Sequence, residues 1–319
     1  MGRDHVRTLT ATAVLAAAAA ALTGCGNLSF GTHEETRSYT APAGISALKI
    51  NGDGSRVEVT ASDTNTIKVS ERLRWSNEKN KPDARHVTEG DALTLSAKCA
   101  DATIGFTNCG VSYRIQIPRD VPVEIDNSNG SIVASGLGGK VDLHSDNGSI
   151  EVSDMRATSA SISSNDGSVS VSGQAGTTDL NSENGSITAT GLTTDRLKAR
   201  SRDGRIRLSG QVKTADLHTS NGSIDVAGLA AERVTARTSD GGLKLGFISA
   251  PTNVQASSDN GSIRVMLPSG QGYAITTSTD NGGEQIDSGV QQDPRSSRQV
   301  RLDTDNGSIT VRPADQRSW

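Results

Sequence analysis

The residues best suited to chemistry are basic side chains that recur at one place in a series of short repeats. Arg200, His218 and Arg237 each stand four residues before a glycine that closes a repeat. If the repeats stack as strands, these side chains lie about 4.8 Å apart on one outer face. Arg205 and Arg207 add two cations nearby. Such a patch could bind a phosphate, an anionic cell-wall polymer or an acidic glycan through charge-assisted hydrogen bonds.

The alternative for the same residues is a solvated face whose positive charge is balanced. Asp203, Asp216 and Asp225 lie in the same stretch of sequence. Mixed charges of this kind are typical of an exposed surface. We favour the balanced face and keep anion binding as a hypothesis.

Carboxylates at the repeat turns were the next candidates, because a glycoside hydrolase needs two of them roughly 5–10 Å apart. Asp146, Asp259 and Asp280 share one turn position, and Asp303 and Asp305 share a predicted strand. Asp beside a turn normally serves turn geometry, so the sequence predicts no catalytic residue. The pattern of calcium-binding repeats is absent and the 5 His are scattered, so no metal or other cofactor is predicted.

The N-terminus has the pattern of an export signal. Arg3 and Arg7 precede an apolar run, Leu9–Leu22, that is too short to span a bilayer. The run ends in Leu22-Thr23-Gly24-Cys25, which resembles the bacterial lipoprotein cleavage box. The resemblance implies a signal peptide over residues 1–24 and a lipid on the sulfur of Cys25. An ordinary signal peptide with an incidental cysteine is the alternative.

Two further cysteines, Cys99 and Cys109, form an even pair in an oxidising compartment once Cys25 is lipidated. The sequence predicts a disulfide between them that closes the loop 100–108. A metal site is the rival interpretation. It is disfavoured because no other Cys or His lies near enough in the sequence to complete four ligands.

These residues are positioned by a repeat that runs through most of the chain. Ten glycines each follow Asn or Asp, at successive spacings of 18, 19, 18, 19, 18, 19, 20, 21 and 25. They are Gly130, Gly148, Gly167, Gly185, Gly204, Gly222, Gly241, Gly261, Gly282 and Gly307. A repeat this short and regular predicts a stack of one supersecondary unit.

Columns of like residues within the repeat predict which side chains face inward. Aliphatic residues recur two and four positions after each glycine, except at Glu284, and polar residues stand between them. Ser, Thr or Asn recurs three positions before each glycine, with the parity of further apolar residues. Since strand side chains alternate between faces, the aliphatic and hydroxyl columns point into one core. The hydroxyls are expected to satisfy one another from coil to coil.

Asn-Gly is also the strongest short signal for a β-hairpin, so a hairpin meander is the alternative fold. Matching columns across almost every repeat favour an all-β parallel β-helix, or β-solenoid, with 18–19 residues per coil. A second set of turn glycines six residues later indicates a second bend per coil; they are Gly136, Gly173, Gly191, Gly210 and Gly228.

We assign the remaining regions from composition. Residues 25–40 are polar and predicted to be a tether, and 41–122 an N-terminal β cap that covers the first coil. Within that cap, the charged stretch 76–91 is expected to be a surface loop. The repeat array occupies 123–312 and a tail 313–319. The net charge of −4 is mixed along the chain, with aromatics at only 3%, so nucleic acid is not a predicted partner.

The N-terminal strands, the segment Tyr-Arg-Ile-Gln-Ile-Pro at 113–118 and the Asn-Gly-Ser-Ile repeats resemble a bacterial family of unknown function. Its members are usually labelled "putative adhesin" or β-strand-repeat proteins. The resemblance covers about residues 41–312 and implies a single-stranded right-handed β-helix without a catalytic motif. We therefore expect a lipid-anchored, non-enzymatic, adhesin-like module on the outer face of the cell membrane. Its partner would be a cell-wall glycan or an envelope protein. The alternative is a carbohydrate-active enzyme or a binder of anionic wall polymer.

Overall fold

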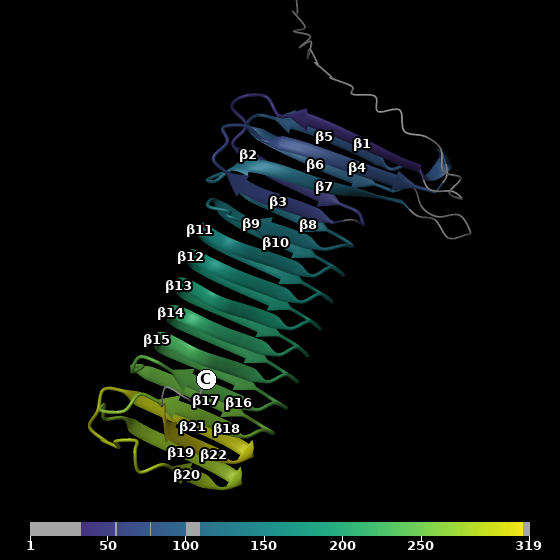
Figure 1. The fold of residues 1–319 in the computed structure, drawn as a ribbon. Helices are drawn as coiled ribbons and strands as arrows, with labels where there is room; N and C mark the ends of the chain where they lie inside the picture. Colours follow the sequence, from purple (N-terminus) through teal and green to yellow (C-terminus); the bar gives the residue numbers. More distant parts are fainter. Residues whose placement is uncertain (1–32, 55, 77, 100–108, 315–319) are drawn as a thin grey trace, which may run out of the picture. The chain divides into compact units, whose positions relative to one another are not determined.

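The protein is an all-β stack of coils, seen in a computed structural model that describes residues 33–54, 56–76, 78–99 and 109–314 (Figure 1). The N-terminal strands are β1 His33–Thr40, β2 Ala47–Gly52, β3 Val57–Ser62, β4 Lys68–Trp75, β5 Asp83–Glu89, β6 Ala92–Lys98 and β7 Cys109–Pro118. The next are β8 Val123–Asn127, β9 Ile132–Ser135, β10 Lys140–Ser145, β11 Ile150–Ser164, β12 Val169–Ser182, β13 Ile187–Ser201, β14 Ile206–Thr219 and β15 Ile224–Thr238. The last are β16 Leu243–Phe247, β17 Asn253–Ser258, β18 Ile263–Leu267, β19 Ala274–Asn281, β20 Glu284–Ile286, β21 Gln299–Asn306 and β22 Ile309–Pro313. One short 3₁₀ turn, Glu78–Asn80, interrupts the described strands.

Neighbouring coils pair as parallel strands in the register that the repeat predicts. Val169 pairs with Ile150 on one side and with Ile187 on the other. The inward aliphatic columns are almost fully buried, with Ile187 and Val226 at 0% exposure. Each long strand from β11 to β15 passes through a bend, where its register shifts. The hairpin meander is therefore excluded for this array, and a parallel β-solenoid is confirmed.

The hydroxyl column is buried, as predicted, but its members do not bond to one another. Ser182 accepts the N–H of Gly185 at 3.0 Å and donates to the carbonyl oxygen of Gly167, in the preceding coil, at 3.0 Å. The same pair of bonds recurs at Ser164, with Gly167 and Gly148. We call the Asn/Asp-Gly turn the corner. At Ser164 and Ser182 the hydroxyl thus bonds to backbone groups of two coils at the corner.

The corner glycines are required by close packing and not by a left-handed backbone. A Cβ added to Gly185 would lie 2.2 Å from the carbonyl oxygen of Gly167, and one added to Gly148 would lie 1.8 Å from that of Gly130. Of these corner glycines, Gly130 has a positive φ, of 101°. Since one backbone rests directly on the next, only a residue without a side chain fits.

The second bend does use the left-handed region. Gly173 and Gly210 have φ of 115° and 126°, and Gly136, Gly191 and Gly228 are also positive. In one coil this place is taken by Asp154, whose φ of 52° is the one positive value among the described non-glycine residues. The predicted second turn signal is therefore confirmed as a bend.

At the N-terminal end the coils do not follow chain order. The segment β2–β3 pairs in parallel with β8–β9, as expected for a degenerate first repeat, and on its other side with the later segment β6–β7. Antiparallel strands cover that outer segment: β4 pairs with β7, β5 with β6, and β1 with β4. These strands shield the last parallel edge from further pairing.

Two expectations for this region were wrong. Residues 33–40, predicted as part of a tether, form β1, and residues 83–89 of the predicted surface loop form β5. Both strands are polar because most of their side chains are exposed. Their polar composition is typical of a loop, but the backbone of each segment pairs with a neighbouring strand, β1 with β4 and β5 with β6. Residues 1–32, which hold the predicted signal and the rest of the tether, lie outside the described residues.

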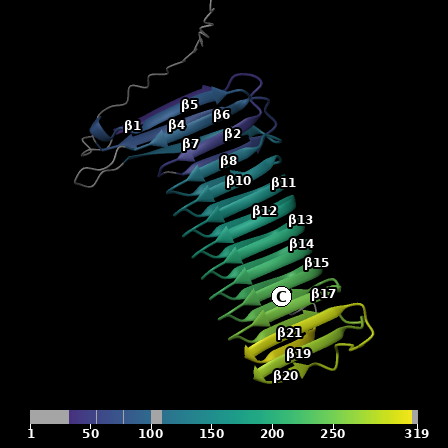
Figure 2. The same cartoon turned by 180° about the vertical axis from the view of Figure 1, so that it is seen from behind.

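The C-terminal end shows a second exchange of order. The last coil in the chain, β21–β22, pairs with β17–β18, and the earlier segment β19–β20 pairs with β21–β22 from the other side. Figure 2 shows β21 between β17 and β19. Thr304 accordingly donates to the carbonyl of Gly261 at 2.9 Å, and Thr279 donates to that of Gly307 at 2.9 Å. The late irregular spacing in the sequence marks this exchange.

Cys99 and Cys109 are joined by a disulfide, as predicted. The loop that it closes, 100–108, lies outside the described residues. Within the described part of the chain, no helix is long and apolar enough to cross a membrane.

Candidate functional site

The predicted basic patch is divided by the corner. Arg200 pairs in register with His218, and His218 with Arg237, on the strands that lead into the corner. Arg205 and Arg207 lie at and beyond it, where Arg207 pairs with Thr188 and Asp225. The structure therefore brings the first three residues together and places the other two on the next side of the coil.

The half of the patch before the corner is largely balanced by carboxylates. Arg200 lies 3.6 Å from Asp216, and Lys198 lies 3.4 Å from Asp179. Burial raises the pKa of the Asp179 carboxyl, while the charge of Arg200 opposes this shift. These contacts agree with the solvated, balanced face that we favoured. Such exposed pairs contribute little to stability.

The half beyond the corner gains cations that the sequence analysis did not single out. Lys244 pairs with Asp225 on the neighbouring strand, and Arg264 with Lys244. The sequence does contain the pattern that groups these cations. Three residues after four successive glycines stand Arg207, Asp225, Lys244 and Arg264. Reading each repeat along the chain obscured it, because these residues are neighbours only across the stack.

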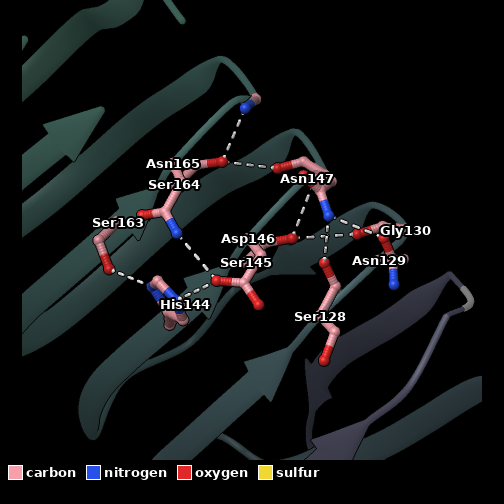
Figure 3. Close-up of polar contacts among 12 residues, drawn as sticks. Ser128, Asn129, Gly130, His144, Ser145, Asp146, Asn147, Ser163, Ser164 and Asn165 are labelled. Carbon is pink, nitrogen blue, oxygen red and sulfur yellow. Dashed lines mark hydrogen bonds and ion pairs between the residues drawn. The ribbon is translucent and has the colours of Figure 1, made fainter. Parts of the chain in front are cut away.

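A second polar cluster lies at the corner itself (Figure 3). His144 Nδ1 is 2.9 Å from the Ser163 hydroxyl, and its Nε2 is 3.2 Å from Asp146 Oδ1. Asn165 also donates its amide to Asp146 Oδ1, at 2.9 Å. The three residues come from two different coils, so the sequence does not show serine, histidine and carboxylate in one place.

Hydroxyl, imidazole and carboxylate in a chain have the composition of a nucleophilic triad. Catalysis by such a triad also needs donors for an oxyanion and a hollow that holds the substrate. The five most pronounced hollows along the described coils do not include His144 or Ser163. The backbone N–H groups of these strands bond to the neighbouring strands and do not point to an oxyanion. His144 and Ser163 are themselves paired in register. Register alone thus accounts for their contact.

A hollow with a volume of about 630 Å³ runs along the bend side of several coils. Its floor is formed by small, nearly buried residues such as Ala175 and Ala231, and its rim includes Lys213 and the carboxylates Asp195 and Glu232. These two carboxylates come from coils two apart, about 9.6 Å along the stack. Asp195, Lys213 and Glu232 are single residues of continuous strands, and the segment before β17 adds Ser249 and Ala250 to the lining.

A buried acid lies among the N-terminal strands. Glu71 is 2% exposed and accepts a hydrogen bond from the Tyr39 hydroxyl at 3.2 Å. Burial raises the pKa of this carboxyl, against the hydrogen bond from Tyr39 and the charges of His86 and Arg37. The His86 ring stacks on Tyr39 with centroids 4.3 Å apart. This group affects stability and faces no hollow that we find in the described chain.

The predicted lipidation site, Cys25, lies outside the described residues. Among those described, no three His, Cys, Asp or Glu side chains gather in a way that could hold a metal ion.

Fold and surface together define a parallel β-solenoid protein with polar and charged columns on its outer faces. The chain belongs to the Toastrack DUF4097 family, whose model matches residues 45–209 and 173–312. This confirms the family resemblance seen in the sequence. A search of curated protein sequences finds no match.

Solved structures include several that resemble the chain. A putative adhesin from Parabacteroides merdae is 16% identical with a TM-score of 0.49, covering 88% of this chain and 96% of that one. A putative adhesin from Bacteroides fragilis is 15% identical with a TM-score of 0.36, covering 88% and 97%. A putative lipid binding protein from Parabacteroides distasonis is 14% identical with a TM-score of 0.44, covering 88% and 97%.

Proposed function

We propose that this chain is an exported lipoprotein that presents an adhesin-like, non-enzymatic interaction module in the bacterial cell envelope. The observation that carries the proposal is the sequence Leu22-Thr23-Gly24-Cys25 directly after an Ala-rich apolar run. Cleavage before Cys25 and acylation of its sulfur would attach the stack to the outer face of the cell membrane. More than one acyl chain is needed for stable anchoring.

The same proposal gives each region a role. Residues 1–24 are the signal and the cysteine at 25 begins a short tether. Strands up to residue 122 form a cap, and residues 123–312 form the displayed array. We infer right-handed coils of 18–19 residues, because parallel strands are almost always connected with that hand. Hydrogen bonds between side chains of successive coils, such as Asn147 with Asn129, support this coil length.

The absence of catalysis is also part of the proposal. It is supported by the use of Ser, Asn and Gly for stacking, and by the position of Asp195 and Glu232 within continuous strands. A carbohydrate-active enzyme would need walls that hold a sugar between an acid and a base. Incubation with envelope glycans and with a fluorophosphonate probe tests this. Release of reducing ends, or labelling of Ser163, would make the chain an enzyme.

Anchoring is tested by producing the chain in a bacterium fed radiolabelled palmitate. We expect label on the protein and its recovery with membranes, and loss of both in Cys25→Ser. The matched control is the Cys99→Ser/Cys109→Ser variant, which lacks the disulfide and should keep the label. Membrane recovery of Cys25→Ser equal to that of the native chain would refute lipid anchoring.

A further inference from the structure

Four cations lie close together on the side of the coils that follows the corner. They are Arg205, Arg207, Lys244 and Arg264, which we call the post-corner patch. Lys244 and Arg264 are paired in register, and Asp225 lies between Arg207 and Lys244 in the same column. All four side chains are exposed. The patch therefore follows the direction in which the coils stack, across four of them.

The patch carries a surplus of positive charge, because its four cations have one acidic neighbour in the column, Asp225. Within the described part of the chain, none of its four side chains forms an ion pair with a carboxylate. Asp225 is the one acidic residue in the hollow that three of them line. This contrasts with the strands before the corner, where Arg200 and Lys198 each have a carboxylate partner.

The hollow beside the patch supplies neutral hydrogen-bonding groups as well. It has a volume of about 500 Å³. Its lining includes the hydroxyl residues Ser223, Ser262, Ser308 and Thr310. The Ser223 hydroxyl accepts a bond from Arg205 Nε at 2.8 Å, which holds one edge of that guanidinium against the sheet. The remaining donors of Arg205 stay free for a ligand.

We propose that the post-corner patch binds a linear polymer that carries phosphate groups, lying across the strands along the stack. Three coil steps separate Arg207 from Arg264, about 14 Å at the usual strand spacing. Guanidinium and ammonium groups at this spacing suit successive phosphates on a flexible chain, and Arg binds phosphate in a bidentate manner. The hydroxyls would hydrogen-bond to the linkers between phosphates. This site goes beyond the proposed function, since it does not depend on the lipid at Cys25.

The spread of the cations along the stack favours a polymer over a lone ion. A single phosphate contacts only the nearest side chains, whereas several linked phosphates contact all four and release counterions from each. Affinity for a polymer should therefore fall steeply with salt. Affinity for inorganic phosphate should be weak at every salt concentration.

The test measures binding of the purified protein to linear polyphosphate at several salt concentrations. We expect the triple variant Arg205→Gln/Lys244→Gln/Arg264→Gln to bind at least tenfold more weakly. The slope of log affinity against log salt should also fall, by about 0.7 for each cation removed, as for single-stranded polyanions. The matched control removes three cations before the corner, Lys198→Gln/Arg200→Gln/Arg237→Gln. It should lose less than threefold.

Equal losses in the two triple variants would overturn the proposal, because binding would then follow net charge and not the patch. Tighter binding to vesicles of anionic phospholipid than to polyphosphate would also overturn it, in favour of a membrane surface. Thermal melting of both variants checks folding. The substituted residues are exposed or half-exposed and none belongs to the core, so the melting temperatures should match that of the native chain within a few degrees.

Discussion

Asn260 donates its side-chain amide to the carboxylate of Asp240, in the preceding coil, at 2.8 Å. Asn221 bonds in the same way to Asp203, and Asn184 to Asp166. Carboxylate and amide thus alternate at the corner from coil to coil. The alternation keeps like charges two coils apart, about 9.6 Å instead of 4.8 Å.

The first prediction concerns this amide ladder. Asn221→Asp places three carboxylates on consecutive coils and removes a donor, so it should destabilise the protein by about 1 kcal/mol through like-charge repulsion. The loss should shrink in high salt, because the groups are exposed. Asn147→Asp is the control, since one of its neighbours is the neutral Asn129. Urea unfolding at two salt concentrations measures both, and a larger loss in the control would contradict the alternation.

The second prediction separates close packing from backbone conformation at the corner. Gly185→Ala places a methyl group 2.2 Å from the carbonyl oxygen of Gly167. The coils must then move apart, at a cost of about 3 kcal/mol or more. Gly283→Ala is the matched control, because nothing lies within 4 Å of its added Cβ. Thermal melting should show a fall of roughly 6–12 °C for the first variant and little change for the second.

The third prediction concerns β11, whose second bend has Asp154 at the place where β12 to β15 have glycine. Asp154 holds a left-handed backbone, which costs a residue with a side chain about 1 kcal/mol. Asp154→Gly should therefore stabilise the protein by up to that amount. Asp154→Val should destabilise it, because β-branched residues tolerate positive φ least. Equilibrium unfolding measures the stability of both variants. If Asp154→Val were more stable than Asp154→Gly, the stability of the bend would not depend on φ.

The fourth prediction concerns pH. The pKa of Glu71 is raised above its ordinary value of 4.5 by burial, so the folded chain retains a proton that the unfolded chain releases. Stability from this group is therefore present below pH 4.5 and is lost as pH rises through the folded pKa. Glu71→Gln removes that loss and can still accept the bond from Tyr39. Its melting temperature should exceed that of the native chain by more at pH 7 than at pH 4.

A fifth prediction concerns the last coil of the stack. Glu284 stands where other repeats have an aliphatic residue, and its carboxylate accepts a bond from Thr277 at 2.7 Å. A charge at this place discourages another strand from joining the open edge of β20. Glu284→Ile should cause concentration-dependent association in sedimentation experiments. Glu183→Ile is the control, because it places the same apolar side chain away from the edge. It should show the same association state as the native chain in sedimentation.

The repeat could be predicted because its physical causes are local. Side chains alternate between the two faces of a strand, so the spacing of the aliphatic and hydroxyl residues predicted the burial of Ile187 and Ser182. The role of the corner glycines did not follow. Glycine is required both by a turn with positive φ and by a backbone that touches its neighbour, so the sequence alone does not say which cause applies. The close approach of the Gly167 backbone to Gly185 in the structure shows that the second cause applies here.

The surface was harder to predict for a related reason. Contacts such as His144 with Ser163, or Lys244 beside Arg264, join residues about one coil apart in sequence. They become visible only when the repeats are set in register. Likewise β1 and β5 form strands through pairing with β4 and β6, a preference that their exposed polar side chains do not encode.

The exchanged order of the last two coils also affects how the chain completes itself. A ribosome delivers residues 274–286 before residues 299–313, yet the earlier segment rests on the later one. The final strands therefore lie inside the stack, between β17–β18 and β19–β20, and not at its end. Loss of residues 299–313 would remove the parallel partners of both neighbouring segments at once.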